Sequence, residues 1–373
     1  MTSTLSTRTR LAAGVATLAL AAGCAGLAGC ANRPGLESGS EASETTTATP
    51  SESSSSASAS TKDANQQKAK LDLQAHRGGR GEHTEESLES FKKALDLGVT
   101  TLEFDIVMSK DGVPVVWHDP IVLASKCADA EGNNFVGQKI HDLTWDELQT
   151  LTCDKKLDGF DEQKPVKGNK MIQLADVFAL TKERGADVFY NIETKVEGEH
   201  RDWSAEPQEF VDAIMKEVDA AGVADKVFIQ SFDWRTLPLV KASHPDVMTV
   251  MLWDETTWKS YSMWTGDVDY DEVGGDIFKA AEQLKADVLS PGYTVPYGLT
   301  PKDKNFLLVA DKKFVDKAHE AGLLVIPWTI NDEDTMREQI KTGVDGIITD
   351  YPTKLRKVME DMGIPAPKPF PGK

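Results

Sequence analysis

The amino-acid sequence predicts an α/β protein, a TIM (β/α)₈ barrel with a small disulfide-stapled insertion. Short apolar runs alternate with amphipathic stretches about eight times from Leu71 onward, which indicates parallel strands joined by crossover helices. Residues 119–170 interrupt this alternation and hold two cysteines. An open doubly wound sheet is the alternative. It is disfavoured because no Gly-x-Gly-x-x-Gly fingerprint opens the first helix.

Nine short apolar runs are the candidate strands. In chain order they are residues 71–76, 100–108, 113–118, 186–194, 226–232, 247–253, 286–291, 323–328 and 345–350. The third run follows a Lys110-Asp111-Gly112 turn, which is typical of a β-hairpin. Setting this hairpin arm aside leaves eight strands for the barrel.

Amphipathic stretches between the strands predict helices, and most of them end in a glycine just before the next strand, where a helix commonly stops. The clearest are residues 85–98, 207–222, 305–322 and 332–343. The interruption at 119–170 is polar, with one short helical piece at 143–151. We expect it to be an insertion on the catalytic face of the barrel.

Two cysteines, Cys127 and Cys153, lie in the insertion, 26 residues apart. In an extracytoplasmic protein an isolated pair of this kind favours a disulfide. Two buried thiols are the alternative.

The N-terminal segment has the layout of a lipoprotein signal peptide, residues 1–30. Arginines precede a short apolar run that ends in small residues, and the sequence LAGC at its end resembles a lipobox with Cys30 as the lipidated residue. Residues 31–70 are rich in Ser, Thr and Ala, so we expect a flexible tether. The barrel domain would then span 71–363, followed by a Pro-rich tail at 364–373.

The composition excludes some classes of partner. The chain has 373 residues, of which 40% are hydrophobic and 27% charged, with a net charge of −19. This acidic balance argues against nucleic-acid binding, because no basic surplus is available to pair with phosphates. It is compatible with a divalent-cation site without pointing to one.

Catalytic groups of a barrel gather where strands end at its C-terminal face. Glu103 and Asp105 lie two apart on the second strand and therefore share one of its faces, and Glu193 comes from the next barrel strand. Acidic side chains on an apolar strand are costly unless they are paired or bind a metal. Together the three carboxylates suit a hard cation, Ca²⁺ or Mg²⁺, whereas a rim ion pair is the alternative for Glu103 and Asp105 alone.

The stretch QAHRGGRGEH places His76 and Arg77 at a strand end that opens into glycine. Glycine lets the backbone approach a ligand closely, histidine moves protons near neutral pH, and arginine holds an oxyanion with two hydrogen bonds. A second histidine, His118, ends the hairpin arm. Taken alone, the His-Arg-Gly triplet would also fit a solvated loop.

The chain resembles the glycerophosphodiester phosphodiesterases in the order and spacing of several segments. These are AHRGGRG, TEESLESF, LEFDIVMSKDGVPVVWHDP, NIETK, SFDW, PWTIND and GVDGIITDYP. The resemblance extends from Leu71 to about Met362. It implies a metal-dependent TIM barrel that hydrolyses glycerophosphodiesters to an alcohol and glycerol 3-phosphate.

The resemblance also implies a role for each candidate residue. His76 and His118 correspond to the acid/base pair, the three carboxylates to the ligands of one divalent cation, and Arg77 and Lys195 to phosphate-binding residues. Trp328, at the end of the seventh barrel strand, is a candidate apolar wall for the glycerol or head group, with simple burial in the barrel as the alternative.

One departure from the family pattern lies after the first strand. The family usually has Pro-Glu-Asn-Thr there, whereas this chain has Thr84-Glu85-Glu86-Ser87. The extra carboxylate of Glu86 leaves the fine choice of substrate open, more than the type of reaction.

The expected partners are a small-molecule glycerophosphodiester and, through the lipid anchor only, a membrane. Neither nucleic acid nor an obligate protein partner is expected, and the domain would face the outside of the cell membrane. Two alternatives remain open from sequence. One is an enzyme that acts on lysophospholipids or envelope glycerol-phosphate polymers. The other is a non-catalytic lipoprotein that binds phosphorylated ligands.

Overall fold

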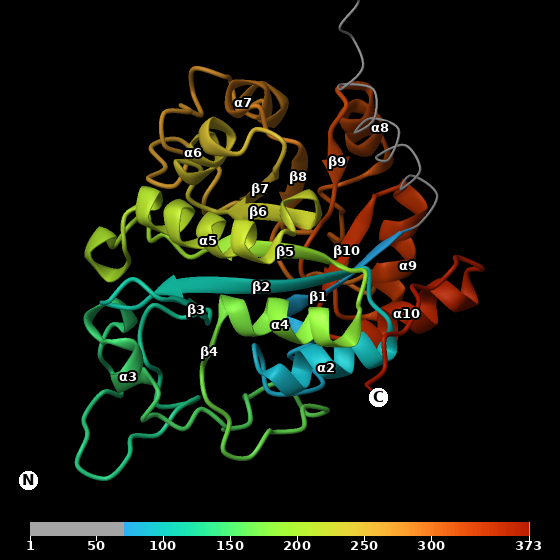
Figure 1. Cartoon of the computed structure of the whole chain (residues 1–373). Coiled ribbons are helices and arrows are strands. Elements are labelled where there is room, and N and C mark those ends of the chain that lie inside the picture. The colour runs from blue at the N-terminus through green and yellow to red at the C-terminus, as the bar shows by residue number, and fades with distance from the viewer. Residues whose placement is uncertain (1–70, 373) are drawn as a thin grey trace, which may run out of the picture. The chain divides into compact units, whose positions relative to one another are not determined.

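The computed structural model describes residues 71–372, and these contain eight parallel strands surrounded by helices (Figure 1). The strands are β1 (Asp72–Ala75), β2 (Thr101–Met108), β5 (Phe189–Thr194), β6 (Val227–Ser231), β7 (Met248–Trp253), β8 (Val288–Pro291), β9 (Leu324–Val325) and β10 (Gly346–Thr349). The predicted signal peptide (1–30), Cys30 and the tether (31–70) lie outside the described residues.

The strands close into a barrel, as predicted. Their order is β10-β1-β2-β5-β6-β7-β8-β9. Backbone hydrogen bonds from Asp345 N to Val325 O (2.9 Å) and from Ile330 N to Ile348 O (3.0 Å) join the segment containing β9 to β10. An open doubly wound sheet would leave these two edges apart, so this alternative is wrong.

Helices follow the strands and pack around the barrel, with α2, α4, α5 and α6 in contact in that order. Their bounds are α2 (Leu88–Leu97), α4 (Leu174–Arg184), α5 (Pro207–Ala221), α6 (Thr236–Ser243), α7 (Ile277–Leu284), α8 (Lys312–Glu320), α9 (Glu333–Thr342) and α10 (Pro352–Asp361). Among residues 71–372, none of the helices is long and apolar enough to cross a membrane.

Several predicted elements are shorter than expected, and two of them differ most clearly. The helix predicted at 305–322 begins only at Lys312, because the Asp311 side chain accepts from Phe314 N and caps it there, while Leu308 forms a β-bridge with Thr294. The strand predicted at 323–328 is reduced to β9, although Ile326 N and Trp328 N still donate to Leu289 O and Pro291 O beside β8.

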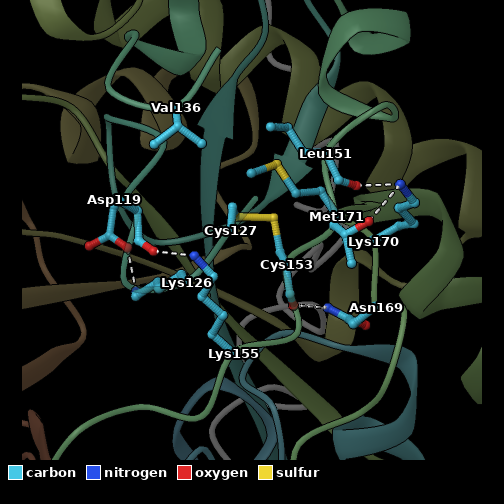
Figure 2. Close-up of a disulfide and its surroundings, with 12 residues drawn as sticks. Asp119, Lys126, Cys127, Val136, Leu151, Cys153, Lys155, Asn169, Lys170 and Met171 are labelled. Carbon is cyan, nitrogen blue, oxygen red and sulfur yellow. Dashed lines mark hydrogen bonds and ion pairs between the residues drawn. A yellow bond between two sulfur atoms is a disulfide. The ribbon is translucent and has the colours of Figure 1, made fainter. Parts of the chain in front are cut away.

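The hairpin and the insertion have the predicted form. β3 (Pro114–Val116) pairs antiparallel with β2, and a short strand, β4 (Ile172–Gln173), extends the pairing. Between β3 and β4 lie a 3₁₀ turn, η2 (Ile140–Asp142), and α3 (Trp145–Leu148). Cys127 and Cys153 form a disulfide beside a small apolar core of the insertion (Figure 2). The alternative of two buried thiols is therefore wrong.

The interior of the barrel holds both apolar and polar side chains. One apolar cluster is made of Phe228, Val250, Val288, Ile326 and Ile348. Beside it, Asn191 Nδ2 donates to Gln74 Oε1 (2.8 Å) and to Gln230 Oε1 (3.0 Å). Gln230 Nε2 in turn donates to Glu103 Oε1 at 2.6 Å. This buried network supports the first of the predicted carboxylates from below.

The C-terminal tail folds back onto the barrel. Phe370 N donates to Leu95 O (2.8 Å), and an Arg356 guanidinium nitrogen donates to Pro367 O (2.8 Å). The tail thereby covers part of a cavity of about 520 Å³ at the N-terminal ends of the strands.

Candidate active site

The candidate residues meet in a pocket of about 180 Å³ at the C-terminal ends of the strands. Its lining includes every predicted catalytic and substrate-binding residue and two of the three predicted metal ligands: His76, His118, Arg77, Lys195, Trp328, Glu103 and Glu193. Asp105 lies directly behind them, 1% exposed. The larger cavity at the opposite end is lined mainly by apolar side chains, with no histidine. Chemistry, and not volume, therefore locates the site.

The chain turns sharply after β1, which brings His76 into the pocket. Residues His76–Gly78 form a 3₁₀ turn, η1, in which Arg77 has a positive φ of 51°. Gly78, also at positive φ, packs against α2 so closely that a Cβ would lie 2.5 Å from Ser90 Oγ. Glycine is thus required at this position of the HRG motif.

Asp350 orients His76. Its Oδ1 lies 2.5 Å from His76 Nδ1 and 3.1 Å from Arg80 Nε, while its Oδ2 accepts from Asn331 Nδ2 at 2.7 Å. Because a carboxylate only accepts, Nδ1 carries the proton and Nε2 is left for the pocket. Burial lowers the pKa of His76, although the charge of Asp350 opposes this shift.

Asp350 was not among the predicted site residues. It ends the run predicted as the last strand, at 345–350, so the strand-end rule applied to His76 would also have selected it. Asn331 and Arg80, which hold its carboxylate, were missed as well.

His118 faces the pocket from the end of the hairpin arm. Its Nδ1 lies 3.0 Å from Asp119 Oδ1, so this carboxylate also selects the tautomer with Nε2 free. Burial, together with the positive charges of Arg77 and Lys195, lowers the pKa of His118 to about 3.

Glu103, Asp105 and Glu193 converge as predicted. Each offers a carboxylate oxygen, and these atoms lie within 4.8 Å of one another. Burial and the neighbouring Asp105 charge raise the pKa of Glu103 well above its usual range, and burial raises the pKa of Glu193 to about 8. Three buried carboxylates this close repel one another unless a cation or protons intervene.

Asp105 differs from Glu103 and Glu193 in the direction of its pKa shift. Burial alone would raise its pKa, but the charges of Arg77 and Lys195 hold it well below its usual range. Its two oxygens are buried and accept no well-aligned hydrogen bond. Buried oxygens of this kind call for a further partner. The donor set is all oxygen, which fits a hard divalent cation.

Two cations border the carboxylates. Lys195 Nζ donates to Glu193 Oε1 (2.8 Å) and lies 3.8 Å from Asp105 Oδ1. Arg77 Nε lies 3.0 Å from Asp105 Oδ2, and a terminal nitrogen of its guanidinium donates to Glu85 Oε2 at 3.1 Å. Both side chains line the pocket, and their charges offset those of the buried carboxylates.

Glu86, the residue that departs from the family pattern, is also buried at this floor. Its Oε1 accepts from Asp105 N at 2.9 Å, and its Oε2 has no hydrogen-bond partner. Burial and the charge of Asp105 raise the pKa of Glu86 well above its usual range. This direction of shift favours the uncharged form of the Glu86 carboxyl group.

Aromatic rings form one wall of the pocket. Trp328 is half-buried, and its indole Nε1 donates to Ser290 O at 2.9 Å. Its ring centroid lies 5.3 Å from that of Phe232 and 5.3 Å from that of Tyr297. Trp328 therefore lines the pocket and also packs against the apolar cluster inside the barrel.

Comparison with known proteins agrees with this geometry. The sequence profile described as "Glycerophosphoryl diester phosphodiesterase family" matches residues 76–354. The chain belongs to this family. It is accordingly a phosphoric diester hydrolase.

The similar proteins align with this chain over nearly their whole length. A glycerophosphodiester phosphodiesterase of Caldanaerobacter subterraneus is 26% identical over 78% of this chain and 98% of its own. A crystal structure from Silicibacter pomeroyi, described as a glycerophosphoryl diester phosphodiesterase, has a TM-score of 0.67 at 27% identity and covers 79% of this chain and 95% of its own. A phosphodiesterase of Oleispira antarctica, in complex with the product sn-glycerol-3-phosphate, has a TM-score of 0.57 at 21% identity, covering 78% and 97%. At this identity it supports the fold alone.

Proposed function

We propose that this chain hydrolyses glycerophosphodiesters to an alcohol and glycerol 3-phosphate, using one divalent cation and two histidines. The observation that carries the proposal is the convergence of Glu103, Asp105 and Glu193 in the same pocket as His76 and His118. A phosphodiester resists attack because its anionic charge repels nucleophiles and its alkoxide leaves poorly. The site contains groups that can offset the anionic charge and groups that can protonate the leaving alkoxide.

The three carboxylates would hold the cation, Ca²⁺ or Mg²⁺. When bound, it would neutralise charge that develops on the phosphoryl oxygens. Arg77 and Lys195 supply further positive charge beside it, and their pairing with carboxylates keeps both side chains in place before the substrate arrives.

His76 and His118 would move the protons. Each has its Nδ1 bonded to a carboxylate, so each presents Nε2 to the pocket. Their low pKa values favour the neutral form, which can accept a proton. One of them would deprotonate water or the glycerol hydroxyl, and the other, once protonated, would donate to the departing oxygen.

The aromatic wall would contact the apolar part of the substrate. The wall is made of Trp328, Phe232 and Tyr297, whose rings carry no charge that would bind phosphate. They therefore suit the glycerol carbons or the head group. A flat ring excludes water and limits the orientations of the alcohol.

Chelation tests the proposal. The purified domain, residues 71–373, should hydrolyse glycerophosphocholine. It should lose this activity in excess EDTA and regain it with Ca²⁺ or Mg²⁺. Glu193→Gln should lose activity that no cation restores, whereas Glu197→Gln, a half-buried neighbour outside the three carboxylates, should behave as the wild type. Full turnover in excess chelator would overturn the cation site.

We extend the proposal to location on the basis of the sequence of residues 1–70. The signal peptide would be cleaved before Cys30, the cysteine would be lipidated, and residues 31–70 would tether the domain outside the cell membrane. The Cys127–Cys153 disulfide supports an oxidising compartment. Intact-mass measurement of the membrane fraction should give a lipid-modified chain beginning at Cys30, and an unmodified N-terminus would reject the anchor.

A further inference from the structure

A lysine of the insertion contacts carboxylates on two sides of the site. Lys126 immediately precedes Cys127 of the disulfide, and both are drawn in Figure 2. Its Nζ donates to Glu85 Oε1 and to Asp119 Oδ2. The Lys126 side chain is only 11% exposed, so water competes little for these contacts.

Each of the two carboxylates continues to a residue of the proposed mechanism. The second oxygen of Asp119 lies 3.0 Å from His118 Nδ1. The second oxygen of Glu85 accepts from the Arg77 guanidinium at 3.1 Å. Lys126 thus closes a continuous chain of ionic contacts from His118 to Arg77.

The backbone around Lys126 is held by the insertion. Lys126 N and Cys127 N both donate to Leu123 O, at 3.0 and 2.9 Å, and Cys127 is fully buried. The disulfide therefore fixes the residue next to the lysine. The ammonium also lies 5.4 Å from the Trp117 ring centroid, which restricts its stem.

We infer that Lys126 is a positioning residue for His118, an inference that rests on the proposed acid/base role of that histidine. Lys126 holds one oxygen of Asp119, so the other oxygen is left in line with His118 Nδ1. Without the lysine, Asp119 is free to rotate toward water, and the imidazole loses both its fixed tautomer and its direction. Lys126 itself lies outside the lining of the pocket.

A purely structural role is the competing explanation, because Lys126 also neutralises the buried Glu85. The two explanations differ in what they predict. A counter-ion for Glu85 would change stability and the Arg77 side of the site. A positioning residue would change the state of the His118 ring and the chemical step.

Lys126→Met is the first test, with glycerophosphocholine as substrate. Loss of an outer partner of a catalytic group costs about 10–100-fold, and we expect this loss in kcat with KM changed less than about threefold. Lys126→Arg should recover most of the activity. Lys155→Met, which removes an exposed lysine that donates to Ala124 O in the same segment, is the matched control and should act as the wild type.

Asp119→Asn tests the inference even if Lys126→Met folds poorly, because it leaves the contact between Lys126 and Glu85 in place. If Lys126 acts through Asp119, adding Lys126→Met to Asp119→Asn should cost little more activity. Additive losses, or full activity in Asp119→Asn, would overturn the inference.

Nitrogen-15 NMR of the His118 ring gives a readout that needs no turnover. In the substrate-free protein the ring should carry its proton on Nδ1, and Lys126→Met should shift it toward a mixture of tautomers, with the signal assigned by its absence in His118→Gln. An unchanged ring signal would overturn the positioning role. A wild type that shows the expected tautomer but hydrolyses no glycerophosphodiester would instead overturn the proposed function.

Discussion

The two histidines of the site are supported by different parts of the molecule. His76 and its partner Asp350 follow β1 and β10, which pair with Ala75 opposite Thr349. The next residue on each strand therefore lies beside the other, although 274 positions separate His76 from Asp350. The barrel register itself makes this contact.

The support of His118 is local in the sequence and lies outside the barrel. Asp119 is the adjacent residue, and Lys126 is only seven positions from Asp119. The disulfide at Cys127 holds this short segment, since the insertion has only a small apolar core of its own. One histidine thus depends on the closed sheet and the other on a covalent link, and the following experiments address this difference.

Replacing either histidine should have the largest effect. His76→Ala and His118→Ala should each lower kcat by about 10²–10⁴-fold, because general acid–base catalysis contributes about this factor. The double variant should lose far less than the product, since both act in one step. His244→Ala, a partly exposed histidine paired with Asp219, is the control. Retention of half the activity in either variant would remove that histidine from the mechanism.

Removing the carboxylate behind each histidine should separate the two supports. Asp350→Asn should lower kcat about 10–100-fold, and by more than Asp119→Asn, because Asp350 is also held in place by Asn331 and Arg80. Steady-state kinetics on the two variants make the comparison. A larger loss in Asp119→Asn would reverse the ranking.

Removing the disulfide should affect only the His118 support. The double variant Cys127→Ser/Cys153→Ser should lose about 2–4 kcal/mol of unfolding free energy, a typical value for such a bridge. Its kcat should fall several-fold, and its His118 ring signal should resemble that of Lys126→Met. Urea denaturation and NMR on the folded variant check both. If the His76 ring signal changed instead, the two supports would not be independent.

The pH dependence of stability should show the smallest difference. The folded pKa of His118 is about 3, below its unfolded value of 6.5, so the folded state favours the neutral ring. Its contribution is present above pH 6.5 and is lost as pH falls toward 3. In EDTA, His118→Gln should flatten the decline of unfolding free energy between pH 6.5 and 4, by about 1 kcal/mol or less per pH unit.

His76→Gln is the companion measurement. Burial also lowers the pKa of His76, but Asp350 opposes the shift, so the flattening should be smaller than for His118→Gln. Equal slopes in the two variants would mean that Asp350 does not offset the burial of His76.

Local patterns in the sequence were sufficient for much of the fold and site. The alternation of strands and helices predicted the barrel, and spacing two apart on a strand placed Glu103 and Asp105 on one face. The cysteine count predicted the bridge between Cys127 and Cys153. The helix predicted at 305–322 was too long, because the apolar pattern continues through a loop before the cap at Asp311.

The sequence by itself determined which side chains are available for chemistry and which strand end carries each of them, because side-chain periodicity and turn residues act over a few positions. Only the tertiary structure decided which groups are partners. Asp350 meets His76 through the register of β1 and β10, and Lys126 reaches both Asp119 and Glu85 through the packing of the insertion against the first loop. Such contacts depend on register, burial and the disulfide, which are properties of the whole chain.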